Sequence, residues 1–170
     1  MRYIFFFIFF FVSTTFSQQS KQSAKQDSSL FDFWIGDWNL TWNDPDGSVA
    51  TGTNTITKIL DGKVIMENFT GLTGQSKGYK GQSISILDSR TGIWKQTWVD
   101  NQSAYLPFTG GAEGKNRFFE QEFINNGKLQ KGKMIFRDIT REKFVWDWMQ
   151  STDSGKTWTT QWSIRYIRKK

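Results

Sequence analysis

The chain has 170 residues, a formal net charge of +6 at pH 7, and neither cysteine nor histidine. Without these residue types it has no disulfide framework, no Cys or His metal cluster, no Ser-His-Asp triad and no histidine-ligated haem. Its basic residues are scattered apart from four at 165–170, so the sequence lacks the basic stripe typical of nucleic-acid binding. We expect no metal, no cofactor and no nucleic-acid partner, and any catalysis would use carboxylate, Tyr, Lys or Arg side chains.

The N-terminal segment has the pattern of a signal peptide at 1–17. Arg2 precedes a wholly apolar run at 4–12, which is far shorter than the roughly 20 residues of a spanning helix. Small residues follow, and we place cleavage after Ser17. We therefore expect an exported protein, periplasmic or extracellular, with no membrane span after cleavage and a disordered polar leader at 18–29.

Residues 30–170 have the pattern of a single all-β domain. The apolar segment at 30–35 predicts one helical turn capped by Ser28 or Ser29. Turn signals rich in Asp, Asn and Gly recur at short intervals between β-branched and aromatic runs. They predict about ten strands, at 37–43, 48–60, 63–71, 80–88, 93–100, 102–110, 115–124, 128–139, 143–151 and 157–168. Tight turns make neighbouring strands antiparallel, and closure removes both sheet edges, so we predict an up-and-down antiparallel β-barrel.

The tryptophans predict which strand faces point inward. Side chains alternate across a strand, and four of the predicted strands each carry a heavily aromatic face. These faces hold Trp38, Leu40 and Trp42; Trp94, Gln96, Trp98 and Asp100; Phe144, Trp146, Trp148 and Gln150; and Trp158, Thr160, Trp162, Ile164, Tyr166 and Arg168. Two interpretations stay open: the rings fill the lumen, or they line a ligand cavity with polar anchors at Gln96, Asp100, Gln150, Tyr166 and Arg168. The two are compatible if packing occupies one end and a pocket the other.

Carboxylates inside the predicted strands are the other candidate functional groups. Glu67 shares a strand face with Phe69, and if that face points inward it is a buried acid, either paired with an Arg such as Arg137 or functional. Glu120 and Glu122 lie opposite an aromatic face, so we expect both to face water.

Gly36-Asp37-Trp38 at the start of the first strand, with Arg168 ending the last, resembles the calycin barrels, in which a late Arg packs across such a Trp. The chain from about 30 to 168 also resembles an uncharacterised bacterial family of secreted proteins with lipocalin-, nitrobindin- and fatty-acid-binding-protein-like barrels. The shared pattern is Phe31-Asp32-Phe33-Trp34-Ile35-Gly36-Asp37-Trp38, Gly81-x-Ser83, Trp94-x-Gln96-x-Trp98-Val99-Asp100 and Ser151-x-Asp153-x-Gly155-x-Thr157-Trp158. This resemblance implies the fold and a closure formed by Trp38 and Arg168. The haem binding of nitrobindins is not carried over, because it needs a His.

Residues 151–158 also resemble an Asp-box, the hairpin motif repeated in sialidase propellers. A propeller needs at least four blades, and this chain has one copy. We interpret Ser151, Asp153, Gly155 and Trp158 as a hairpin staple, in which the Asp side chain binds turn amides and the Trp packs beneath.

The leading hypothesis is a binding protein for a small apolar or amphipathic molecule, possibly anionic. Trp98, Trp148 and Trp162 would line the lumen, and Gln96, Asp100, Tyr166 and Glu67 would supply polar contacts. One alternative is an enzyme with Glu67 or Asp100 as base in that lumen. Another is a carbohydrate- or surface-binding module with exposed tryptophans. The sequence favours binding over catalysis and carries no signal for an oligomeric state.

Overall fold

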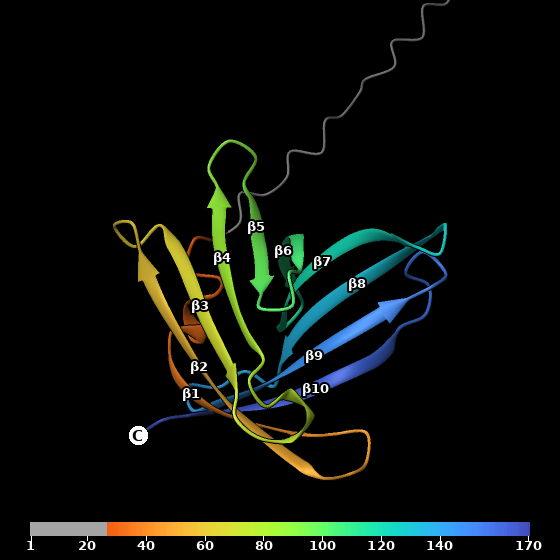
Figure 1. Ribbon diagram of the computed structural model, residues 1–170. Helices are drawn as coiled ribbons and strands as arrows, with labels where there is room; N and C mark the ends of the chain where they lie inside the picture. The colour runs from red at the N-terminus through yellow and green to blue at the C-terminus, as the bar shows by residue number, and fades with distance from the viewer. Residues whose placement is uncertain (1–26) are drawn as a thin grey trace, which may run out of the picture.

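The computed structural model describes residues 27–170, so the predicted signal peptide and residues 18–26 of the predicted leader lie outside the described residues. The described chain forms ten strands and two short 3-10 turns in one closed antiparallel barrel (Figure 1). The elements are η1 (Asp32–Trp34), β1 (Gly36–Asn43), β2 (Val49–Ile59), β3 (Val64–Gly71), η2 (Gly74–Ser76), β4 (Lys80–Asp88), β5 (Ile93–Asp100), β6 (Tyr105–Glu113), β7 (Asn116–Asn125), β8 (Lys128–Arg137), β9 (Lys143–Ser151) and β10 (Thr159–Arg168).

Each strand pairs with its neighbours in sequence, and β1 pairs with β10 to close the sheet. The predicted ten-stranded antiparallel barrel is therefore confirmed. Strand β6 departs most from its predicted start at 102. The carboxylate of Asp100 accepts hydrogen bonds from the amides of Gln102 and Ala104, which keeps these residues in a turn.

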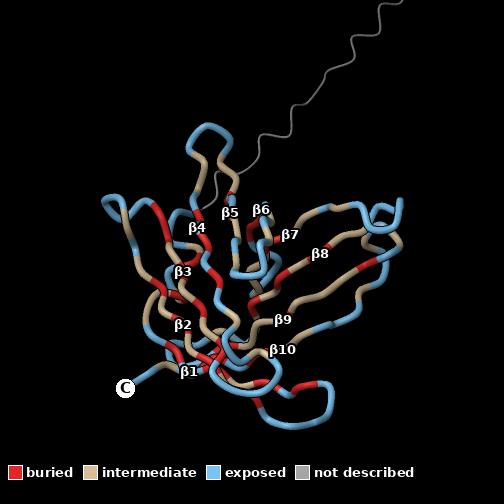
Figure 2. The backbone as a smooth tube through the Cα atoms, in the orientation of Figure 1, coloured by how far each residue is buried: buried red, intermediate tan, exposed pale blue. Residues whose placement is uncertain are grey.

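Burial alternates along the strands as a closed barrel requires (Figure 2). The inward face of β1 is fully buried at Trp38, Leu40 and Trp42. Eight of the nine tryptophans belong to the interior cluster or pack against it, and Trp158 does not. The fold thus places nearly all of its largest side chains inside.

The predicted inward position of Trp158 is wrong. A bulge at Gln161 shifts the pairing of β10 with β9, so that Thr160 pairs with Met149 but Trp162 pairs with Trp148. One extra residue reverses the alternation, and the inward set begins only at Trp162. Trp158 lies instead on the outer face, where the ammonium of Lys133 is 5.7 Å from its ring centre.

Successive hairpins alternate between the two ends of the barrel, and η1 fills one of them. Phe31 stacks on Phe119 with ring centres 4.6 Å apart and meets Trp94 and Phe136 edge-on. All four rings are buried. The predicted Ser cap on this turn is wrong: the residue before η1 is Phe31, which makes no side-chain cap, and Ser29 contributes its backbone carbonyl to the Asp32 amide. We call this the plugged end.

Arg168 holds the plug to the barrel. Its guanidinium lies 4.2 Å from the ring centre of Trp38 and donates hydrogen bonds to the carbonyls of Phe33, Ile35 and Arg141. A side chain at Gly36 would collide with this guanidinium, which accounts for glycine in the Gly-x-Trp motif. The contact joins the first and last strands at the plugged end.

The hairpin between β9 and β10 is held by side chains. Asp153 accepts hydrogen bonds from the amide and hydroxyl of Thr157 and from the hydroxyl of Ser151. Gly155 has φ of 91° and accepts the indole N–H of Trp158. The hydrogen bonds from Thr157 and Ser151 hold the pKa of Asp153 well below its usual range.

Within residues 27–170, none of the helical turns has the length and apolar character needed to cross a membrane.

Candidate ligand-binding site

A cavity of about 220 Å³ occupies the lumen opposite the plugged end, which we call the open end. Tryptophans from three strands form much of its wall: Trp98 on β5, Trp146 and Trp148 on β9, and Trp162 on β10. All four are half-buried. The remaining lining residues are Trp34, Glu67, Phe69, Tyr79, Leu106, Phe108, Met134, Ile164 and Tyr166. The lumen is therefore filled by aromatic rings at one end and hollow at the other.

Glycines on neighbouring strands hold two of these rings against the wall. A Cβ at Gly81 would collide with the ring of Trp98, and a Cβ at Gly132 with the ring of Trp148. In both pairs the glycine is two residues along from the direct cross-strand partner of the tryptophan. The rings can lie flat along the barrel wall because their neighbours have no side chain, and this keeps the centre of the lumen open.

Glu67 lies at the floor of the cavity and is the carboxylate on its wall. It is 6% exposed. Its Oε1 accepts a hydrogen bond of 2.6 Å from the Asn54 side-chain amide, and its Oε2 accepts one of 2.6 Å from the Ser83 hydroxyl. Burial raises the pKa of Glu67 from 4.5 to about 7, while these two hydrogen bonds act in the opposite direction. Near neutral pH the group therefore exchanges readily between its charged and neutral forms.

Tyr166 stands beside this acid. Its hydroxyl accepts a hydrogen bond of 3.2 Å from the Asn54 amide, which also serves Glu67. Burial, with the charge of Glu67, raises the pKa of Tyr166 well above 10, so the phenol stays neutral and keeps a proton to donate. Two buried polar atoms beside these groups have no hydrogen-bond partner among the described residues: Nε1 of Trp34, which lines the cavity, and Oδ1 of Asn54. The floor thus presents several groups able to fix the orientation of a polar ligand atom.

Five of the seven residues predicted to contact a ligand lie on the cavity wall: Glu67, Trp98, Trp148, Trp162 and Tyr166. The other two do not. Gln96 is buried and donates to Ser85, and Asp100 lies at the rim. The carboxylate of Asp100 is occupied by the hydroxyl of Tyr79, the indole N–H of Trp98 and two turn amides.

Of the two alternatives for Glu67, the pairing with Arg137 does not occur. Arg137 lies on the outer face and forms ion pairs with Asp147 at 2.6 Å and Asp138 at 2.7 Å. Glu122 also faces outward, paired with Lys131 at 2.8 Å, as expected from the buried Phe119 on the opposite face. Glu67 is consequently left without a cationic neighbour among the hydrogen bonds and ion pairs of the described chain.

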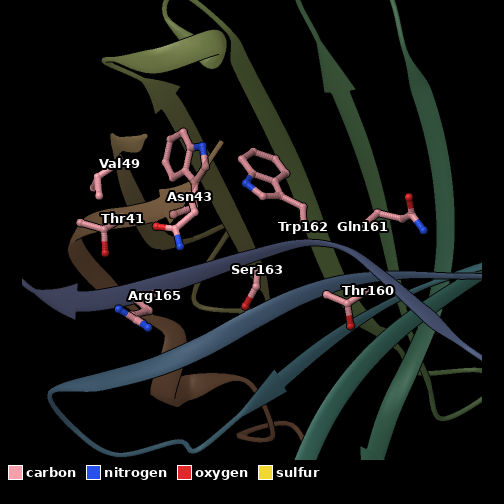
Figure 3. Close-up of a pocket in the computed structure, with 9 residues that line it drawn as sticks. Thr41, Asn43, Val49, Thr160, Gln161, Trp162, Ser163 and Arg165 are labelled. Carbon is pink, nitrogen blue, oxygen red and sulfur yellow. The ribbon is translucent and has the colours of Figure 1, made fainter. Parts of the chain in front are cut away.

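The seam between β1 and β10 opens toward the rim of the cavity. The two strands pair over only four residues, from Trp38 with Arg168 to Thr41 with Arg165. Beyond that point they separate, leaving an outer groove of about 350 Å³ (Figure 3). Trp162 lines both this groove and the lumen, while Ser163 points to the other side of β10 in Figure 3. Trp162 is therefore the side chain that separates the outer groove from the cavity.

Sequence reasoning missed several residues of the site. Asn54 lies on the inward face of β2, where Thr occupies every second position and Asn54 alternates with it. Because Ile56 shares the face of Asn54, this two-residue pattern could have placed Asn54 inside. Ser83 is part of the Gly81-x-Ser83 pattern and pairs directly with Glu67 across β3 and β4. Tyr79 and Trp34 lie outside the strands, and only the folded chain brings them to the lumen.

Among residues 27–170 there is no group of three or more metal-ligating side chains close enough to hold a metal ion.

The comparison with known proteins found matches among solved structures. No protein-family model matches the chain, and no curated protein matches it either. A redesigned β-barrel matches with a TM-score of 0.44 and 10% identity over 85% of this chain and 99% of that one. A de novo designed fluorescence-activating β-barrel matches with a TM-score of 0.45 and 10% identity over 85% of this chain and all of that one.

Proposed function

We propose that this protein binds a small amphipathic molecule in the cavity at the open end of the barrel. The observation that carries the proposal is the cavity itself: four half-buried tryptophans surround it, and a buried acid and a phenol form its floor. An aromatic wall with a few converging polar groups is the usual form of a small-molecule site. The proposal includes a relationship to lipocalin-like barrels. The contact of Arg168 with Trp38 at the plugged end supports this part of it.

The volume limits the size of the ligand. An apolar protein cavity of roughly 150 Å³ holds one benzene molecule. A cavity of about 220 Å³ therefore fits one ring with a short polar arm. A tetrapyrrole or a long acyl chain would extend well beyond this cavity.

Export is a further part of the proposal, supported by the apolar run at 4–12 that follows Arg2. N-terminal sequencing of the protein recovered from the secreting cell would test it. A start at Gln18 is expected, and an intact N-terminus would contradict export.

The binding test uses the purified protein and two probes of matched size, 2-phenylethanol and 2-phenylethylamine, followed by tryptophan fluorescence and calorimetry. We expect at least one probe to bind with a stoichiometry of one. The variant Trp148→Ala removes a cavity wall, whereas Trp158→Ala removes a tryptophan from the outer face and is its matched control. Binding that weakens in Trp148→Ala and persists in Trp158→Ala supports the cavity. Equal loss in both variants, or no binding by the parent protein, would overturn the proposal.

A second candidate function is acid–base catalysis by Glu67. The raised pKa of this buried carboxyl is the observation in its favour, because a base is most effective when its pKa lies near the working pH. Asp100 does not share this property. Burial raises the pKa of Asp100, but its hydrogen bonds, of which the one from Tyr79 contributes most, have the larger effect. The pKa of Asp100 is therefore lowered. Incubation with a small-molecule extract of the source cells should deplete a compound with the parent protein and not with Glu67→Gln. If the parent protein and Glu67→Gln left identical sets of compounds in the extract, catalysis by Glu67 would be rejected.

A further inference from the structure

The charge of the cavity is opposite to that of the chain. The protein carries a net charge of +6, yet the ionisable residues on the cavity wall are Glu67, Tyr79 and Tyr166. Among residues 27–170 no Lys or Arg lines this cavity. The lumen therefore holds a carboxylate and neutral phenols, and its local field favours a positive ligand.

Glu67 is a buried carboxylate whose two hydrogen-bond donors in the described part of the chain are both neutral. Asn54 from β2 and Ser83 from β4 each give it one hydrogen bond, and the titratable groups that face it are Tyr166 from β10 and Tyr79 from the segment before β4. None of these groups carries a positive charge. An ionised acid removed from water without a counter-ion is costly, and a ligand cation would supply the missing partner.

Two polar groups of the aromatic wall are engaged by hydrogen bonds at the rim, whereas the indole N–H of Trp34 has no partner among the described residues. The indole N–H of Trp98 and the hydroxyl of Tyr79 are both engaged by the rim carboxylate of Asp100, at 3.1 and 2.7 Å. Phe69 lies two residues beyond Glu67 on the same face of β3, with ring centres 6.3 Å from Trp98 and 6.0 Å from Trp162. Aromatic faces attract cations, and clusters of such rings recognise organic ammonium groups.

An anionic ligand fits this arrangement poorly. Its charge would lie in the same lumen as Glu67, with no basic residue of the described chain on the wall to offset either group.

We propose, building on the proposed function, that the ligand is a small organic ammonium ion whose charged group lies between Glu67 and the ring of Trp98 and whose apolar part lies among Trp148 and Trp162. The cavity of about 220 Å³ restricts it to about one ring with a short amine-bearing arm, or an aliphatic amine of similar bulk.

The test compares three probes of matched shape by calorimetry on the purified protein: 2-phenylethylamine as the cation, 2-phenylethanol as the neutral probe and phenylacetate as the anion. At pH 8 we expect the amine to bind about tenfold more tightly than the alcohol, and phenylacetate to bind most weakly. Lowering the pH from 8 to 5 should weaken amine binding as Glu67 becomes protonated, because its pKa is about 7. The affinity for the alcohol should change much less.

Two variants localise the effect. Glu67→Gln should reduce the ratio of amine to alcohol affinity from about tenfold to near one. Trp98→Leu should reduce the same ratio through loss of the ring face, which keeps the proposal testable if Glu67→Gln fails to fold. Trp158→Ala, on the outer face, is the control and should retain the ratio.

The outcomes separate the proposal of a cationic ligand from the more general proposal that the cavity binds a small amphipathic molecule. If the alcohol or phenylacetate binds as tightly as the amine, the cavity binds ligands but the cation assignment is wrong. If the amine binds best but neither Glu67→Gln nor Trp98→Leu changes the ratio, the ammonium lies elsewhere and the assignment is again wrong. If none of the three probes binds, both proposals fail.

Discussion

The plugged end and the open end are built from the same kind of inward-facing aromatic residues, yet one is solid and the other hollow. At the plugged end Phe31, Phe119 and Phe136 are each 0% exposed and pack ring against ring. At the open end Trp98, Trp148 and Trp162 are only half-buried and surround a cavity of about 220 Å³.

The difference comes from what lies across the lumen. At the plugged end η1 inserts Phe31 and Trp34 between the strands, while at the open end Gly81 and Gly132 let the tryptophans lie back against the wall. Aromatic content alone therefore does not distinguish a filled core from a cavity. Removing the plug should affect stability most, and changing the open end should affect binding most.

Replacement of Phe31 by Ala has the largest expected effect. It removes a completely buried ring that touches Phe119, Trp94 and Phe136, and such a change costs about 3–5 kcal/mol of the free energy of unfolding. Urea denaturation should show this loss, with probe affinity of the folded fraction little changed. Trp148→Ala is the comparison at the open end and should cost about half as much, since its ring is already half-exposed. An equal cost for both would contradict the contrast between the ends.

The pH dependence of stability should report Glu67. Its folded pKa of about 7 exceeds the ordinary 4.5, so the folded state binds more protons between these values and stability falls as pH rises from about 4.5 to 7. At about 1.4 kcal/mol per pH unit, the loss is about 3 kcal/mol and is complete above pH 7. Denaturation from pH 4 to 8 should show this decline in the parent protein relative to Glu67→Gln. Parallel profiles would mean that the acid is not desolvated as the structure indicates.

Gly81→Ala should lower both the stability of the protein and its affinity for the probes. The new methyl group collides with the ring of Trp98 and pushes it toward the cavity, which costs about 1–3 kcal/mol of stability and weakens probe binding. In the background of Trp98→Leu the same substitution should cost much less, because the ring is gone. A double-mutant cycle measures this coupling, and additive effects would show that the glycine does not support the ring.

Arg168→Lys has the smallest expected effect. Lys keeps a positive charge near Trp38 but loses the fork that donates to the carbonyls of Phe33 and Ile35, so a loss of about 1 kcal/mol is expected. Arg165→Lys is the matched control on the outer side of β10 and should change stability by less than about 0.5 kcal/mol. If the two substitutions lowered stability equally, the contact between Arg168 and Trp38 would have no special role in closing the barrel.

Much of the barrel could be predicted because it depends on local patterns. Turn residues bounded the strands, and two-residue alternation placed Trp38, Trp98 and Trp162 inside. The same reasoning failed for Trp158, because the bulge at Gln161 inserts one residue and reverses the alternation. A bulge arises from the pairing of two strands and has no reliable signal in one of them.

The sequence by itself determined the ten strands, their antiparallel order, the inward aromatic faces and the absence of any Cys or His chemistry. The tertiary structure alone decided that η1 fills one end and that Asp100 is occupied at the rim. It also decided that Glu67 has no cationic partner within residues 27–170, while Arg137 pairs with Asp147. The physical reason is the range of the interactions. Alternation and turn chemistry act between residues a few positions apart, whereas the cavity depends on contacts such as Asn54 with Tyr166, which join opposite ends of the chain.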